Sequence, residues 1–81
     1  SMKTKQDIIE DGAKAKRFLE DTDFMRFMRE IEQDCWSEFK ATTTGDNEGR
    51  EAIYMKLRGV ELVQRSLRAM VDNATIEKRN K

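Results

Sequence analysis

Three acidic residues recur at four-residue intervals in the first half of the chain: Glu30, Asp34 and Glu38. On a helix this spacing places like charges side by side, so a compensating cation is expected next to them. This acidic ridge could hold a divalent metal ion or dock a basic partner. Alternatively, Arg26, Arg29 and arginines later in the chain offset its charge, or water solvates it. We favour these last explanations and expect no metal site, because carboxylate diiron bundles need paired Glu-x-x-His elements and the chain has no histidine.

A second charged set lies later in the sequence and could contact phosphate groups. It consists of Arg50, Arg58, Arg65 and Arg68, and the basic residues Lys78, Arg79 and Lys81 follow it. On a helix these four arginines share one side, which we call the arginine face. Residues 21–41 carry six acids against three bases, so the same arginines could instead pair with that segment, within one chain or between two. Because no turn here is as compact as that of a helix-turn-helix, nucleic-acid binding is the alternative function.

The sequence offers no set of residues suited to covalent or acid–base catalysis. Cys35 lies on an apolar stripe and has no histidine to activate it, so we expect a small core residue rather than a nucleophile. The chain also lacks a glycine-rich phosphate loop. We therefore expect a protein that is not an enzyme and that uses no cofactor.

The composition predicts a small all-α protein. Its 81 residues are 37% hydrophobic and 40% charged, and they include no proline and one cysteine. Sixteen basic and sixteen acidic residues cancel, so no net field draws the chain to nucleic acid or membrane. No apolar run approaches the roughly 20 residues of a membrane span, so we expect no membrane partner. A lone thiol suits a reducing compartment, which favours a cytoplasmic location, and Ser1 before Met2 is interpreted as a cloning remnant.

Hydrophobic periodicity and capping residues predict three helices within a single domain, residues 1–81. The helices span about residues 4–20, 22–41 and 48–74, with a loop at 42–47 and a frayed basic tail at 75–81. Thr4 and Asp7 resemble a capping box, whereas Gly12 weakens the first helix. Asp21 offers a new N-cap, so the first two helices are either neighbours at an angle or one kinked rod. Gly45 can adopt positive φ in the loop.

A short loop between two long helices predicts an antiparallel helical hairpin, to which the short N-terminal helix is added. The expected pairs across the seam are Phe39 with Ile53, Cys35 with Leu57, Ile31 with Val60, Met28 with Gln64 and Phe24 with Leu67. The polar Gln64 could fix the register of this seam. Trp36, near Phe39 and Tyr54, is expected to lie in the core rather than to anchor an interface.

The third predicted helix carries a second apolar stripe on the side away from the seam. This stripe consists of Met55, Gly59, Leu62, Ser66 and Ala69, at intervals of four, three, four and three. Its small residues would let another helix backbone approach closely. Either the helix at residues 4–20 covers the stripe, or a second copy of the chain packs there and completes a bundle, or the helix covers part of the stripe and a partner covers the remainder. We favour a homo-oligomer, with a dimer as the simplest form.

Residues 27–70 resemble a family of small helical-hairpin proteins. The segment DCWSEFK leads through a short polar loop into GREAIYMKLRGVELVQRSLRAM, so that Trp36 comes late in one helix and Leu57-Arg58-Gly59 forms a step in the next. Tailed bacteriophages and prophages encode this family, often among head-assembly and DNA-packaging genes. The resemblance implies a virion-assembly accessory or a small regulator that acts by binding a phage or host protein in the cytoplasm of a bacterial host. It supplies no catalytic residue.

Overall fold

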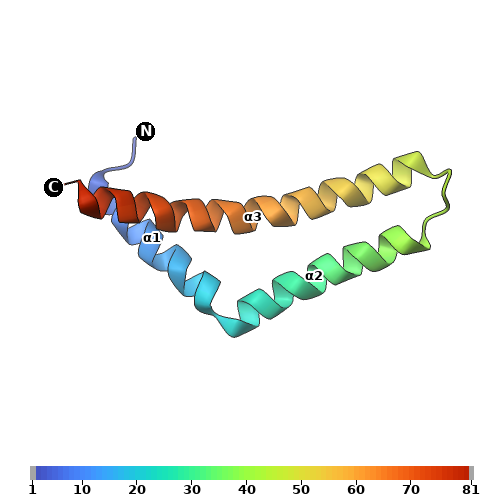
Figure 1. The fold of residues 1–81 in the computed structure, drawn as a ribbon, viewed down its shortest axis with the longest axis horizontal. Coiled ribbons are helices and arrows are strands. Elements are labelled where there is room, and N and C mark those ends of the chain that lie inside the picture. Colours follow the sequence, from blue (N-terminus) through green and yellow to red (C-terminus); the bar gives the residue numbers. More distant parts are fainter. Residues whose placement is uncertain (1, 81) are drawn as a thin grey trace.

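A computed structural model describes residues 2–80, so Ser1, the predicted cloning remnant, and Lys81, the end of the predicted tail, lie outside the described residues. Three α-helices follow one another: α1 (Lys5–Glu20), α2 (Thr22–Ala41) and α3 (Asn47–Arg79). In the described part of the chain there is no β-strand, which confirms the all-α class. Figure 1 shows α3 as one long side of a triangle, with α1 and α2 forming the other two sides.

The sharp corner between α1 and α2 is made by a single residue, Asp21. Its backbone is extended, with φ −75° and ψ 117°, and its N–H donates to the carbonyl of Phe18 at 3.2 Å. Its carboxylate in turn accepts a hydrogen bond from the N–H of Phe24 at 2.8 Å and caps α2. The two helices are therefore neighbours at an angle rather than one kinked rod (Figure 1). Across the corner the rings of Phe18 and Phe24 are 5.3 Å apart.

Local hydrogen bonds also close the loop between α2 and α3. The Thr42 hydroxyl donates to the carbonyl of Phe39 at 2.6 Å, and Asp46 accepts from the N–H of Gly49 at 2.9 Å. Asp46 therefore caps α3. The expectation of positive φ at Gly45 is wrong: no residue in the described range has positive φ, because side-chain caps rather than a left-handed glycine end the helix.

The frayed tail predicted at residues 75–81 is wrong as far as Arg79, because α3 continues to that residue. The extra helical turns lie where α1 packs against α3, and the contact buries Ala15 and Ala74 to 1% and 4% exposure. Lys5 Nζ also donates to the carbonyl of Asn80 at the end of α3. The contact with α1 therefore stabilises the last turns of α3, which the sequence alone predicted to fray, because short helical segments depend on tertiary contacts.

α2 and α3 form the predicted antiparallel hairpin, but α2 diverges from α3 toward the corner (Figure 1). Gln64 Nε2 donates to Glu32 Oε1 at 2.9 Å across the seam, one helical turn from the expected partner Met28. Cys35 and Ile53 are buried, as predicted. Ile31, however, is 46% exposed, so its predicted burial is wrong. The divergence explains this, because α2 must leave α3 for the chain to turn and bring α1 back to the other end.

The molecule is elongated and exposes much of its surface. Its Cα radius of gyration is 17.0 Å, against about 12 Å expected for a compact domain of this length. Its accessible surface is 6405 Å², against about 5,000 Å² expected for a folded monomer of this mass. Among residues 2–80, no helix combines the length and apolar character needed to cross a bilayer. The architecture therefore leaves unusually large areas of helix surface without a neighbour.

Candidate interaction surface

The second apolar stripe of α3 is open to solvent. Met55 and Leu62 are 62% and 60% exposed, and Ser66 and Ala69 are also exposed. A Cβ placed on Gly59 would meet nothing within 4 Å outside its own helix. Of the predicted explanations, coverage by α1 is therefore not what the structure shows. The stripe remains a helix face without a partner in a single chain.

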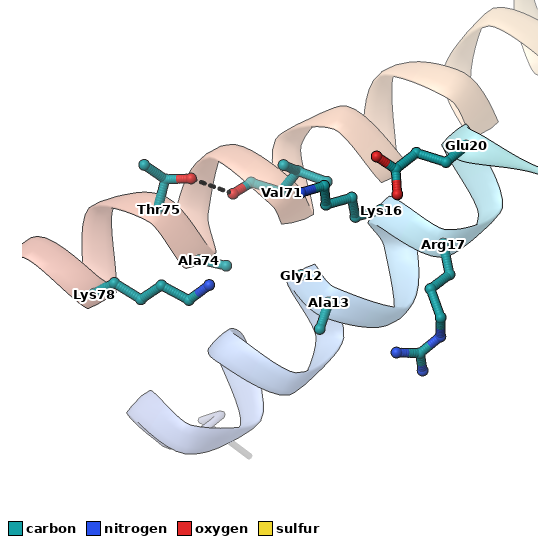
Figure 2. A pocket seen from close by; sticks show the side chains of 9 residues that line it. All are labelled: Gly12, Ala13, Lys16, Arg17, Glu20, Val71, Ala74, Thr75 and Lys78. Carbon is teal, nitrogen blue, oxygen red and sulfur yellow. Dashed lines mark hydrogen bonds between the residues drawn. The ribbon is translucent and has the colours of Figure 1, made fainter.

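α1 contacts α3 along a different side, through a pair of small residues. Gly12 faces Ala74 across the two helices (Figure 2). A Cβ on Gly12 would lie 2.2 Å from the Ala74 Cβ and 2.9 Å from the Met70 carbonyl oxygen, so only glycine fits at this distance. Sequence reasoning treated Gly12 only as a weak point of the first helix. The small residues at Gly12, Ala15 and Ala74 were the signal for a close helix contact.

An open pocket lies along this α1–α3 contact (Figure 2). Gly12, Val71 and Ala74 supply its apolar part, and Lys16 and Lys78 are among the charged residues that line it. Arg17 also lines the pocket, but its side chain extends away from α3 in Figure 2. The Thr75 hydroxyl donates to the carbonyl of Val71 at 3.1 Å and is thus bound to its own helix. The pocket is the edge of a close helix contact, with charged side chains around it.

The apolar stripe extends beyond the residues that the sequence analysis assigned to it. Ile76 follows Ala69 by seven residues and is 52% exposed, and Val63 beside Leu62 is 46% exposed. The seven-residue recurrence of Met55, Leu62, Ala69 and Ile76 is visible in the sequence. Ile76 was missed because the third helix was predicted to end at residue 74. The exposed stripe therefore runs along α3 for six helical turns, from Met55 to Ile76.

An exposed apolar flank on α2 lies on the same side of the hairpin as Val63. The ion pair of Glu38 with Lys56, 3.3 Å between Oε2 and Nζ, marks this side on both helices. Ile31 precedes Glu38 by seven residues and Val63 follows Lys56 by seven, so each lies two helical turns along the same side. Phe27, four residues before Ile31, is 52% exposed. The open surface therefore includes parts of both helices.

The acidic ridge is compensated by one cation that was expected, Arg26, and by one that was not, Lys56. Glu30 accepts from Arg26 at 3.0 Å within α2, and Glu38 pairs with Lys56 of α3. The prediction that the arginines of the last helix offset the ridge is therefore wrong, because Lys56 is the α3 cation that reaches it. Asp34 is exposed. Within residues 2–80, no group of three or more acidic or cysteine side chains is placed to hold a metal ion.

The arginine face is partly occupied by contacts within the chain. Arg50 Nε donates to Thr42 Oγ1 at 2.9 Å, and its guanidinium lies 4.8 Å from the centre of the Phe39 ring. Arg58 pairs with Glu61 at 2.9 Å. Arg65 and Arg68 are exposed, and neither forms an ion pair in the described part of the chain. Of the four arginines, only Arg65 and Arg68 are therefore without a charged or ring contact among the described residues and available to bind phosphate.

Trp36 does not lie in the core, and that prediction is wrong. It is 54% exposed and stacks on Phe39 with ring centroids 5.5 Å apart and an angle of 4° between the planes. Tyr54 is 56% exposed. Cys35 is 6% exposed and carries a free thiol, as expected for a small core residue. The aromatic residues near the loop thus add to the exposed surface instead of filling the hairpin.

One ion pair perturbs the titration of its members, at the start of α1. Lys3 Nζ donates to Asp11 Oδ2 at 2.7 Å. This hydrogen bond, together with the charge of the ammonium group, lowers the pKa of Asp11 below its usual value. The same bond and charge raise the pKa of Lys3. The pair fixes the N-terminal segment to α1, and both residues line a small pocket together with Met70 and Asn73 of α3.

No family model, curated protein or solved structure matches this chain. The exposed surface of the chain includes the apolar stripe on α3 and the apolar flank on α2. Surfaces of this kind on small helical proteins commonly bind other helices.

Proposed function

We propose that this protein is a small non-enzymatic interaction protein of the phage or prophage type, which self-associates through α3 and docks a phage or host partner. The observation that carries the proposal is the exposed apolar stripe: Met55, Gly59, Leu62, Ser66 and Ala69. Its role would be in virion assembly or in modulating a host complex, within the bacterial cytoplasm. The resemblance of residues 27–70 to phage helical-hairpin proteins supports this assignment.

The amount of exposed surface supports self-association. The chain exposes 6405 Å², roughly 1,400 Å² more than the surface expected for a compact monomer of its mass. A standard protein interface removes about 800 Å² from each partner, so one such interface fits within the excess. The buried hydrophobic residues in the described range include two alanines, Ala15 and Ala74, so the core of a single chain is small. Small domains with little core commonly gain stability by oligomerising.

The test is the solution mass across a concentration series, measured by light scattering after size exclusion. We expect wild type to dimerise at tens of micromolar and Leu62→Glu to be monomeric, because the substitution places a charge in the middle of the stripe. Tyr54→Glu is the matched control, since Tyr54 is 56% exposed on the same helix but lies off the stripe. A monomeric wild type, or equal loss of the dimer in both variants, would refute the proposal.

Nucleic-acid binding is the second candidate, and Arg65 and Arg68 favour it because neither forms an ion pair among the described residues. Phosphate contacts predict binding that weakens steeply as salt rises. Charge reversal at both arginines should weaken such binding, whereas reversal at Arg50, which is held by Thr42 and Phe39, should have less effect. Absence of binding to duplex and single-stranded DNA at low salt would exclude this candidate.

A further inference from the structure

The exposed stripe of α3 has the spacing of a coiled-coil seam. Met55, Leu62, Ala69 and Ile76 recur every seven residues, and Ala52, Gly59, Ser66 and Asn73 stand three residues before each of them. Alternation of three and four residues keeps both sets on one side of a helix over its whole length. All eight residues lie in α3 and are exposed. One set is mostly large and apolar, and the other is small or polar.

The size difference between the two sets favours an antiparallel partner. In a parallel pair of identical helices each residue faces its own copy, so Leu62 would face Leu62 and Gly59 would face Gly59. Layers would then alternate between crowded and empty. In an antiparallel pair the two sets face each other, so that Leu62 meets Ser66 of the partner copy and Met55 meets Asn73. Every layer then joins one member of each set, so no layer pairs two of the large side chains Met55, Leu62 and Ile76.

The charges beside the seam favour the same orientation. Arg58 and Asp72 lie on one flank, and an antiparallel register places Arg58 of each copy beside Asp72 of the other. The complementary contact occurs twice in a symmetric dimer, whereas the like-charge contact of Arg65 with Arg65 of the other copy occurs once, next to the two-fold axis. A parallel register instead brings Asp72 near Glu77 of the other copy, which is repulsive. On the opposite flank, the antiparallel register brings the exposed Val63 of both copies together at the centre.

We infer that the occupant of this surface is a second copy of the chain, packed antiparallel along α3 with its two-fold axis between Val63 and Arg65. This inference rests on the proposed self-association and assigns its geometry. The dimer has Gly59 of one copy facing Ala69 of the other, where the absence of a side chain lets the two backbones approach. The excess exposed surface of roughly 1,400 Å² per chain exceeds the roughly 800 Å² that a standard interface requires.

Disulfide trapping tests the orientation. Gly59→Cys and Ala69→Cys are made separately in a Cys35→Ala chain and oxidised alone and as a mixture, with a mass tag on one of them. We expect a disulfide-linked dimer only in the mixture, because the antiparallel register separates each cysteine from its own copy by several helical turns. Disulfide-linked dimers in each sample alone would indicate a parallel pair and overturn the inference.

Two further results separate the inference from the proposed function. If light scattering shows a dimer that Leu62→Glu disrupts but that neither the separate nor the mixed cysteines can trap, the chain self-associates through α3 in another register and the inference fails alone. If light scattering shows a monomer, both fail. A charge exchange checks the register independently of disulfide formation. Arg58→Asp and Asp72→Arg should each raise the dimer dissociation constant about 2- to 30-fold, and the double variant should restore it. No restoration would overturn the register.

Discussion

Substitution of two glycines by alanine should change the stability of the fold in opposite directions. Gly12 and Gly59 both lie inside helices, where alanine is favoured over glycine by about 1 kcal/mol. At Gly59 a new Cβ meets nothing within 4 Å outside its own helix, so that gain should be realised. At Gly12 the Cβ would lie 2.2 Å from the Ala74 Cβ, and α1 must move away from α3.

The expected magnitudes follow from these contacts. Carbon atoms in van der Waals contact are about 3.5–4.0 Å apart, so the helices must separate by more than an ångström at Gly12. Overpacking of this kind costs about 1–3 kcal/mol, and the helix preference of alanine offsets about 1 kcal/mol of it. We expect Gly12→Ala to lower the free energy of unfolding by up to about 2 kcal/mol, whereas Gly59→Ala raises it by about 1 kcal/mol.

Both variants are compared by thermal and urea unfolding, followed by circular dichroism, in a Leu62→Glu chain so that association does not contribute. A change of 1 kcal/mol corresponds to about 4–8 °C in Tm for a domain of this size. Gly12→Ala should therefore melt below Gly59→Ala by at least several degrees. If both substitutions raised the Tm equally, α1 would not pack on α3 at Gly12, and the triangular arrangement would be wrong.

Three further perturbations have defined outcomes. Leu62 is 60% exposed in the single chain, and burial of this surface in the dimer is worth about 1–2 kcal/mol per protomer. Leu62→Glu removes this contribution from both protomers, so sedimentation equilibrium should show a dimer dissociation constant at least about 30-fold higher. Arg50→Ala should lower the free energy of unfolding in urea by about 1–2 kcal/mol through loss of the Thr42 bond and the ring contact, whereas Arg65→Ala should change it by less than about 0.5 kcal/mol. Because Lys3 lowers the pKa of Asp11, the pair stabilises the fold above the usual pKa of an aspartate and loses this effect as the pH falls through the lowered value. Thermal melts should therefore show wild type above Asp11→Asn at neutral pH and the difference shrinking in acid; a constant difference would contradict the assignment.

The starts of the helices could be predicted because they depend on neighbours in the sequence. Thr4, Asp21 and Asp46 each accept a backbone hydrogen bond from the residue three positions later, so their roles follow from local composition. The position of α1 could not be predicted in this way. It depends on the contact of Gly12 with Ala74, 62 residues apart in the chain, and an isolated glycine in a helix indicates only a local cost. The helical end of α3 was missed for the same reason.

The candidate surface was predicted in part. Spacing alone placed Met55 and Leu62 on a stripe opposite the hairpin seam, and the structure leaves both exposed. Ile31 and Trp36 were assigned to the core because an apolar residue near a predicted seam is expected to be buried. Periodicity gives the direction of a side chain around its own helix but not the distance to the next helix. The divergence of α2 from α3 determines that distance.

The corner at Asp21 has a consequence for where α1 can pack. Asp21 ends α1 by donating its N–H to the carbonyl of Phe18, and it begins α2 by accepting the N–H of Phe24 with its carboxylate. One residue therefore provides a hydrogen-bond partner to both helix ends. Without that carboxylate, residues 5–41 have little to interrupt a continuous helix about 55 Å long, comparable with the 56 Å length of the whole molecule. Such a helix would carry the Gly12 surface away from its own α3 and present it to the α3 of a neighbouring chain. The cap at Asp21 therefore favours the packing of α1 on the α3 of its own chain.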